Sequence, residues 1–512
     1  MKRRDFIKSS LVLSAMGSRI PLMAINRTQK QMARTVSFDT DRILVLIKLN
    51  GGNDGMNTII PIQNSQYYNL RPTIGISPTN ALTLNYETGL HPSMDALLPF
   101  FQNGEMSVIH GAGYDASNLS HFRSSDIWAT GSNANVVWNT GWLGRLFTEI
   151  YPDFPNQNED HPLAIQLGSA NLLEFQTTMA NSASMINDPD LMYQLISENY
   201  IPGTNNPPPA TIGGQELTYV RELDASSFEY SEIIFNAANA GTNSVAYPET
   251  NLAAQLAVTA KLISGGLNTP IYRLYLGGFD THANQLEDHS GLLQQISDAV
   301  AAFLSDLESQ GLQNRVMTLT TSEFGRRSYE NGTGGTDHGT SAPILAFGPE
   351  INSNQLFHGT HPDLSQIDAN GNPPVQFDFR QMYTTLLTDW FGFDETVSSS
   401  VFQESFNTIP FVANPLAIAG NGNIPKTFTL YPAFPNPFNP ATEIRFDLPK
   451  ATSVALKVHD IQGRLIYSNK LGKLPVGSHR FRLHGNDWAS GIYYVHVKAA
   501  GSNQVQKITL LK

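Results

Sequence analysis

The chain has 512 residues, 41% of them hydrophobic and 10% aromatic, so it is long enough for more than one domain and can bury a large core. It has no cysteine, which excludes disulfides and thiolate metal sites and leaves zinc, manganese, calcium or magnesium as the metals it could hold. Residues 41–425 carry a net charge of −26, against +6 for residues 1–40 and +8 for residues 426–512. So acidic a centre argues against nucleic acid as a partner, and solubility is its simplest explanation.

The first residues resemble a twin-arginine export leader. Lys2-Arg3-Arg4-Asp5-Phe6-Ile7-Lys8 precedes a short apolar stretch at 11–16, and Leu22-Met23-Ala24 is a candidate cleavage region. An ordinary basic helix start is the alternative. No later stretch reaches the roughly 18 to 20 apolar residues that span a bilayer. We therefore expect residues 1–40 to direct export through the periplasm, and a mature protein without a transmembrane segment.

Residues 41–412 alternate strand-like runs with helical ones. The apolar, β-rich runs are 43–49, 106–110, 271–276 and 316–321, and helical spacing is found at 92–101, 252–264 and 291–308. This alternation predicts an α/β domain with a mostly parallel sheet flanked by helices. In such sheets, ligands bind beyond the carboxyl ends of the strands.

Acidic residues and histidines gather where the predicted strands end. They are Asp54 after the first strand, Asp280 and His282 after 271–276, Glu323 after 316–321, and Asp337 and His338 in the next loop. Each of them alone is more often a helix cap or turn residue. Together they predict a divalent metal centre with one or two ions, because each ion needs about three ligands and an open position for a substrate oxygen.

Four further residues are candidates for catalysis: Ser120, His121, Arg123 and Arg326. Ser120 precedes a helical run, so it is either a nucleophile at a helix N-terminus or a helix N-cap. His121 is a candidate ligand, acid or base, although a lone histidine more often packs or hydrogen-bonds. Arg123 and Arg326 would hold an anionic group bidentately, or else pair with surface carboxylates.

The composition changes after residue 412. Residues 413–427 contain Asn414-Pro415 and Gly420-Asn421-Gly422-Asn423 and are predicted to be a linker. Short alternating runs then follow at 443–448, 453–459, 464–468, 477–483, 491–498 and 504–511. Their spacing predicts a small all-β, immunoglobulin-like sandwich over residues 428–512.

This tail resembles the C-terminal sorting domain of the type IX secretion system. The motifs that carry the resemblance are Pro435-Asn436-Pro437-Phe438-Asn439-Pro440, Asp460-Ile461-Gln462-Gly463-Arg464 and Ala489-Ser490-Gly491-Ile492-Tyr493. The resemblance implies recognition by the export machinery, and secretion or attachment at the outer surface. A generic carbohydrate-binding or adhesive sandwich is the alternative.

A second resemblance covers roughly residues 40–400. Its motifs are Asn50-Gly51-Gly52-Asn53-Asp54-Gly55, Ser120-His121-Phe122-Arg123, Gly141-Trp142-Leu143-Gly144-Arg145, Asp280-Thr281-His282, Ser322-Glu323-Phe324-Gly325-Arg326 and Thr336-Asp337-His338-Gly339. They resemble the family called domain of unknown function 1501, of the alkaline phosphatase-like superfamily that includes sulfatases. The resemblance implies an exported, metal-dependent hydrolase whose substrate is an anionic small-molecule or glycan ester of phosphate or sulfate.

The superfamily pattern implies roles for single residues. Asp54 corresponds to the first acidic ligand, Asp280 and His282 to a middle-strand pair, and His338 to a later histidine. Relatives have Asp-His-Gly where this chain has Glu323-Phe324-Gly325, and Phe324 cannot coordinate a metal. Asp337 is a candidate replacement, and one ion is better supported than two. The alternative is a surface binding or structural protein on a catalytically degenerate scaffold.

Overall fold

The computed structural model describes residues 40–152, 154, 160–168, 173–186, 188, 230–413, 427–431, 433, 436–450, 452–474, 477–485, 488–499 and 501–511. The predicted leader with its cleavage region, and most of the predicted linker, lie outside these residues. The chain divides into two compact units, Met1–Ala417 and Ile418–Lys512.

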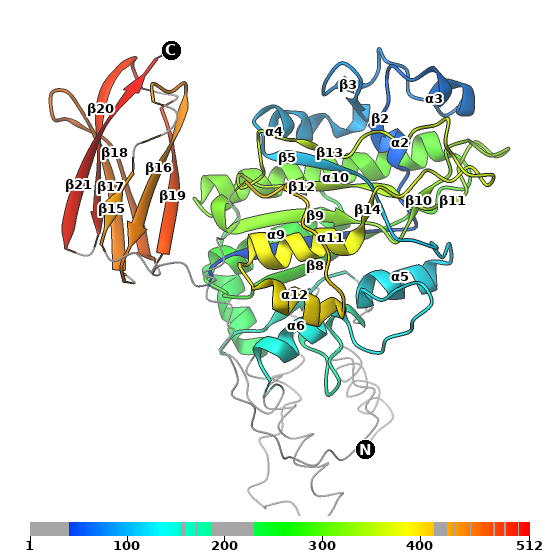
Figure 1. Ribbon diagram of the computed structural model, residues 1–512, viewed down its shortest axis with the longest axis horizontal. Coiled ribbons are helices and arrows are strands. Elements are labelled where there is room, and N and C mark those ends of the chain that lie inside the picture. The colour runs from blue at the N-terminus through cyan, green and yellow to red at the C-terminus, as the bar shows by residue number, and fades with distance from the viewer. Residues whose placement is uncertain are drawn as a thin grey trace, which may run out of the picture. The chain divides into compact units, whose positions relative to one another are not determined.

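A nine-stranded sheet forms the centre of the first unit (Figure 1). Its strands are β1 (Ile43–Asn50), β5 (Met106–Gly113), β6 (Ala164–Gln166), β7 (Ala183–Met185), β8 (Ile271–Gly277), β9 (Val316–Thr321), β12 (Ala342–Phe347), β13 (Phe357–His358) and β14 (Phe377–Asp378). The order is β13-β5-β12-β9-β1-β8-β6-β7, and β14 also pairs with β5. β12 pairs antiparallel with β5 and β9, whereas the other pairs are parallel. The predicted mostly parallel sheet is therefore confirmed.

Helices cover both faces of this sheet (Figure 1). Among the described residues, the α-helices include α2 (Gly55–Thr58), α3 (Ser65–Leu70), α4 (Leu98–Gln102), α5 (His121–Thr130), α6 (Trp142–Ile150), α9 (Asn251–Ser264), α10 (Gln285–Ser309), α11 (Phe379–Thr385) and α12 (Glu395–Phe402). Shorter turns are η1 (Pro92–Leu97), η2 (Leu173–Phe175), η3 (Gln313–Arg315) and η4 (Leu386–Trp390), and the small strands are β2 (Ile59–Ile60), β3 (Leu82–Thr83), β4 (Gly89–Leu90), β10 (Gly325–Arg326) and β11 (His338–Gly339). No helix in the described part of the chain is long and apolar enough to cross a membrane.

The side chains of β1 alternate between two cores, as the two-residue period of a strand requires. Val45 and Ile47 pack in the core that contains residues of α9 and α10. Leu44 and Leu46 pack on the opposite face, in the core that contains residues of α6, α11 and α12. The central strand is therefore apolar on both faces, which explains its nearly continuous hydrophobic run.

The second unit is an all-β sandwich. Its strands are β15 (Thr429–Leu430), β16 (Ala441–Leu448), β17 (Thr452–Asp460), β18 (Leu465–Leu474), β19 (Gly477–His484), β20 (Gly491–Ala499) and β21 (Ser502–Leu510). They form two antiparallel sheets, β15-β16-β19 and β18-β17-β20-β21. Side chains of both sheets, such as Phe446 and Val495, share one core. The predicted all-β tail is confirmed.

Candidate metal centre

Several of the predicted site residues lie at one edge of the large sheet. β1, β5, β8 and β9 run in the same direction, so the residues that follow them lie at the same edge. His121 follows β5, Asp280 follows β8, and Glu323 follows β9. β12 runs the opposite way, so the residues before it, among them His338, reach this edge as well.

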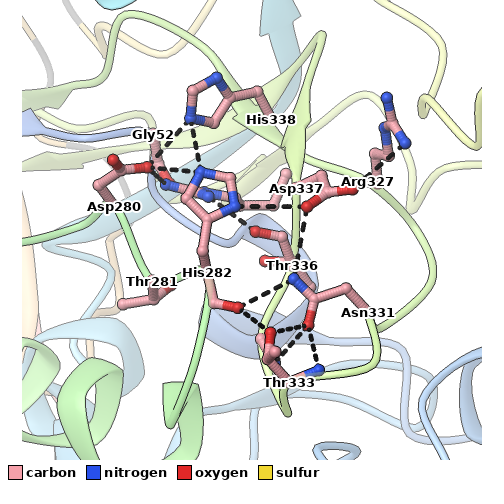
Figure 2. Close-up of polar contacts among 12 residues, drawn as sticks. Gly52, Asp280, Thr281, His282, Arg327, Asn331, Thr333, Thr336, Asp337 and His338 are labelled. Atoms are coloured by element: carbon pink, nitrogen blue, oxygen red, sulfur yellow. Dashed lines mark hydrogen bonds and ion pairs between the residues drawn. The ribbon is translucent and has the colours of Figure 1, made fainter.

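Three histidines direct their Nε2 atoms at the carboxylate of Asp280. His338 Nε2 and His282 Nε2 lie 3.0 Å and 3.1 Å from the Asp280 carboxylate and 3.0 Å from each other (Figure 2). His121 Nε2 lies 3.4 Å from the same carboxylate. In a tetrahedral zinc site with bonds of about 2.0 to 2.1 Å, neighbouring ligand atoms are about 3.3 Å apart. Among the described residues, His121, Asp280 and His338 are the one group of three candidate ligands whose ligand atoms all lie within 4.8 Å of one another.

The Nδ1 atoms of the same histidines face hydrogen-bond acceptors outside the cluster. These acceptors are Leu119 O for His338 at 2.8 Å, Glu323 Oε1 for His121 at 2.9 Å and Asp337 Oδ1 for His282 at 3.3 Å. Carbonyls and ionised carboxylates only accept, so each Nδ1 carries a proton. When the rings are neutral, each Nε2 then presents a lone pair to Asp280. In metal sites, acceptors that bind the Nδ1 atom in this way orient the ligating histidines. A cation would satisfy all of these lone pairs at once.

Electrostatics in the cluster keep Asp280 ionised and the ring of His338 neutral. Burial acts to raise the pKa of Asp280, but the hydrogen bond and the charge of Arg326 hold it well below its usual value. Burial lowers the pKa of His338, so that its ring is neutral near pH 7. The hydrogen bond to Glu323 raises the pKa of His121, whose buried Nε2 has no hydrogen-bond partner among the described residues.

Asp280 is held in place by a buried arginine and a glycine turn. The guanidinium of Arg326 donates to Asp280 Oδ1 at 2.7 Å, and also to Gly52 O and Thr336 O at 2.8 Å each. Gly51 has a φ of +124°, and a Cβ there would lie 2.3 Å from the backbone nitrogen of Asp280. Only glycine permits this approach of the loop after β1 to the loop after β8.

The role predicted for Arg326 needs correction. Its side chain is fully buried and its donors bind backbone carbonyls and Asp280, so it cannot hold the anionic group of a substrate. Arg123 does not point at the cluster either, because its Nη2 donates to the carbonyls of Ala134 at 3.1 Å and Val136 at 2.6 Å. One arginine positions Asp280, and the other anchors a loop.

Asp54 also differs from the prediction. It is the N-cap of α2 and pairs with the guanidinium of Arg71 at 2.6 Å, and both side chains are fully buried. Gln285 donates to the same carboxylate. Burial acts to raise the pKa of Asp54, but the charge and hydrogen bond of Arg71 keep it below its usual value. Since its oxygens are engaged in this network, Asp54 is not available as a metal ligand.

Glu323 and Asp337 lie behind the histidines instead of among the ligand atoms. Glu323 Oε1 also accepts from Gly51 N at 2.8 Å, and Asp337 Oδ2 lies 3.3 Å from Nη1 of Arg327. Phe324, which cannot coordinate a metal, is buried, and its ring lies 4.8 Å from that of His121 and 4.5 Å from that of His338. These residues fix the imidazoles from outside.

The loop before β11 holds His282 from below (Figure 2). Asn331 Nδ2 and Thr333 Oγ1 donate to the carbonyl of His282 at 2.9 Å and 2.6 Å. A Cβ at Gly335 would lie 2.3 Å from the backbone carbon of His282. A glycine is therefore required where this loop crosses His282.

Ser120 lies at the N-cap position of α5, between the two residues that contact the cluster from this segment, Leu119 and His121. Ser120 is exposed, and its side chain makes no capping hydrogen bond. The hydroxyl of Ser117, in contrast, donates to Tyr114 O at 2.6 Å. Ser120 thus has a hydroxyl that the helix does not use.

A cavity of about 370 Å³ adjoins the cluster and shares His121 and Glu323 with it. Lys48 and Arg273 line it from neighbouring strands, β1 and β8. Neither residue was predicted to belong to a site, although each is a charged residue inside an apolar strand: Lys48 in ILVLIKLN of β1 and Arg273 in IYRLYLG of β8. A charged residue inside a predicted buried strand was the signal that could have found them.

Comparison with known families gives two matches. Residues 222–402 match the family described as "Protein of unknown function (DUF1501)", and residues 432–511 match the "Secretion system C-terminal sorting domain". Asp280, His282 and His338 lie inside the first match, whereas His121 lies before it. The tail marks the chain for secretion or attachment at the outer surface. No curated protein matches the chain in sequence.

Solved structures similar to this chain include a protein of the alkaline phosphatase superfamily from Vibrio parahaemolyticus, with 10% identity, coverage of 92% of this chain and 91% of that one, and a TM-score of 0.32. The lipoteichoic acid synthase LtaP from Listeria monocytogenes has 10% identity, 63% and 66% coverage and a TM-score of 0.27. PorZ, a component of the type-IX secretion system of Porphyromonas gingivalis, has 21% identity, 18% and 13% coverage and a TM-score of 0.13.

Proposed function

We propose that this protein is an exported, metal-dependent hydrolase of phosphate or sulfate esters. The observation that supports this most is the convergence of three imidazole Nε2 atoms on one carboxylate, with each Nδ1 bonded to an outer acceptor. A purely structural hydrogen-bond network would place a proton between each pair of polar atoms. Here the Nε2 atoms of His282 and His338 lie 3.0 Å apart beside the Asp280 carboxylate, and neutral rings with protonated Nδ1 atoms would present only acceptors to one another, which is the arrangement that a cation stabilises.

His121, His338 and Asp280, whose ligand atoms all lie within 4.8 Å of one another, would hold one divalent ion, and the neighbouring His282 is a further candidate ligand. Imidazole nitrogen ligands favour zinc over manganese, magnesium and calcium, which prefer oxygen ligands. Such an ion supplies Lewis-acid stabilisation of the negative charge that develops on an ester during hydrolysis. Arg326 would keep Asp280 ionised and in place, while Glu323 would fix the tautomer of His121.

Ser120 is our candidate nucleophile, with water as the alternative. Its hydroxyl is exposed at the N-terminus of α5, where the first backbone N–H groups of the helix carry partial positive charge. These N–H groups would bind the anionic oxygens of the ester, and the serine oxygen would attack its phosphorus or sulfur while the bond to the alcohol oxygen breaks and the serine proton passes to the departing alcohol. Water would then release phosphate or sulfate from Ser120. Arg123 and Arg326 have no part in this step.

The export route is also proposed. The leader at residues 1–40 would take the chain into the periplasm, and the sorting domain would direct it through the outer membrane. Attachment at the outer surface or release would follow.

A second candidate function is a surface binding or structural protein. It is favoured by Asp54, which lies in a buried network with Arg71 and Gln285 instead of at a second metal site. On this alternative the cluster would be a remnant without turnover.

The test is metal analysis of the purified protein, together with hydrolysis of aryl phosphate and aryl sulfate esters. We expect about one equivalent of zinc, lost with activity in Asp280→Ala and retained in the matched control Asp288→Ala, which changes an exposed aspartate of α10. Metal retention without hydrolysis would favour the binding protein. A metal-free wild type whose Asp280→Ala variant behaves identically would refute the proposal.

A further inference from the structure

The cavity beside the cluster lies between the sheet and α5. Lys48 pairs with Thr321 across β1 and β9, and Leu46 pairs with Arg273 across β1 and β8, so Lys48, Thr321 and Arg273 share one face of the sheet. This face is apolar further back, where Leu44 and Leu46 lie in the core. It becomes polar only at the carboxyl edge, next to His121.

The two cations of the cavity wall already have partners. Arg273 Nε donates to Glu174 Oε2 at 2.7 Å, and Lys48 Nζ donates to Ser125 Oγ at 2.8 Å. Three carboxylates, Asp126, Glu174 and Glu323, face these two cations in the cavity lining. An anionic ligand would meet more negative than positive charge, so the cavity is unsuited to a sulfate or phosphate group.

The wall is equally unsuited to an apolar ligand. The cavity lining includes charged side chains, among them Lys48, Asp126 and Glu323. Covering such a group with hydrocarbon costs about 1 to 3 kcal/mol. The ligand must therefore bring both donors and acceptors, as hydroxyl groups do.

Aromatic side chains supply flat apolar surface at the same place. Phe122 lines the cavity and is 87% exposed, and Trp128 and Tyr275 line it further in. Aromatic faces contact the C–H groups of a ring, while the charged side chains bind hydroxyl groups at its edge. The volume of about 370 Å³ is at the lower end for small-molecule sites, so a single ring with a short extension fits.

We propose that this cavity binds the uncharged sugar ring of the substrate, and that the ester group it carries reaches the adjacent cluster. The inference rests on the proposed function, since it names the alcohol part of the ester. His121 and Glu323 form the boundary between the two sites, because both line the cavity while His121 also faces Asp280. Discrimination between esters would then come from Lys48, Arg273 and Phe122.

The experiment is calorimetric titration of the full chain with a panel of neutral methyl glycosides, with adenosine and inorganic sulfate as competing classes. Phe122→Ala should weaken glycoside binding by about two- to tenfold, since its side chain is exposed and its loss does not threaten folding. Lys48→Met should weaken it by about ten- to a hundredfold. Tyr86→Ala, which removes a ring 79% exposed outside the cavity, is the matched control and should change nothing.

Asp280→Ala separates this inference from the proposed function. Glycoside binding that persists in this variant while ester hydrolysis is lost supports both, and glycoside binding to a protein without hydrolysis supports the cavity alone. Sulfate that binds more tightly than any glycoside and is lost in Lys48→Met would overturn the sugar assignment. So would tighter binding of adenosine, or the absence of saturable binding by the whole panel.

Discussion

The ion pair of Asp54 with Arg71 should matter for stability and not for metal binding. Arg71 is fully buried and donates to Asp54 Oδ2 at 2.6 Å, Asn57 Oδ1 at 2.7 Å, and the carbonyls of Ser328 and Arg327 at 2.9 Å each. Asp54→Asn keeps the shape of the side chain but leaves the guanidinium of Arg71 without a counter-charge. Loss of one partner of a buried pair costs about 3 to 5 kcal/mol. For a unit of roughly 400 residues, with an unfolding entropy of about 2.1 cal/mol/K per residue, Tm should fall by about 4 to 6 °C.

The assay is scanning calorimetry, with metal content measured on the folded protein. Asp54→Asn and Arg71→Met should both lower Tm and leave metal stoichiometry unchanged. The double variant Asp54→Leu, Arg71→Met should recover part of the loss, because no buried charge remains unpaired. If Asp54→Asn instead loses metal at an unchanged Tm, Asp54 is a ligand and our account of this network is wrong.

Three further predictions concern the cluster and a buried histidine. Asp337→Asn should weaken zinc binding by about 10- to 100-fold, measured by competition with a chromophoric chelator, because Asp337 orients His282; an unchanged affinity would refute that role. Ser120→Ala should lower kcat for aryl esters by at least about 100-fold at unchanged metal content, whereas a wild-type kcat would leave water as the nucleophile. Burial lowers the pKa of His110 to about 3, against about 6.5 unfolded, so the unfolded chain takes up the proton first and stability falls as pH drops through this interval. Between pH 7 and pH 4.5, the free energy of unfolding measured in urea should therefore fall by about 3 kcal/mol less in His110→Phe than in the wild type. An equal fall in both proteins would contradict the lowered pKa of His110.

The strands were predictable because apolar β-rich runs bounded by turn residues identify buried strands. The run 316–321 is β9, Val316–Thr321, and the run 271–276 falls within β8, Ile271–Gly277. Helix α10 was predicted from residue 291 but begins at Gln285. Its first turns bury polar side chains, Gln285 and His289, which hydrogen-bond to Asp54 and Asn53, and hydrophobic spacing cannot register such residues.

Within the site, residue type indicated the chemistry but not which atoms meet. Nothing in the sequence separates Asp280, whose carboxylate faces the histidines, from Asp54, which is closed off by Arg71. The two carboxylates differ in which distant residues they contact, and those contacts depend on tertiary packing. The same applies to Arg326, whose burial under the loop after β1 could not be inferred from its place after Glu323-Phe324-Gly325.

A cation bound at the cluster would also stabilise the fold of the chain that carries it. His121, Asp280 and His338 come from three distant segments, and the chain has no cysteine to join them covalently. A cation bound there would be a reversible cross-link that closes two long loops of the unfolded chain, with the entropic benefit that disulfides give to other exported proteins. Durability outside the cell would then depend on metal supply instead of redox state, and a chelator would act on this protein as a reductant acts on a disulfide-bonded one.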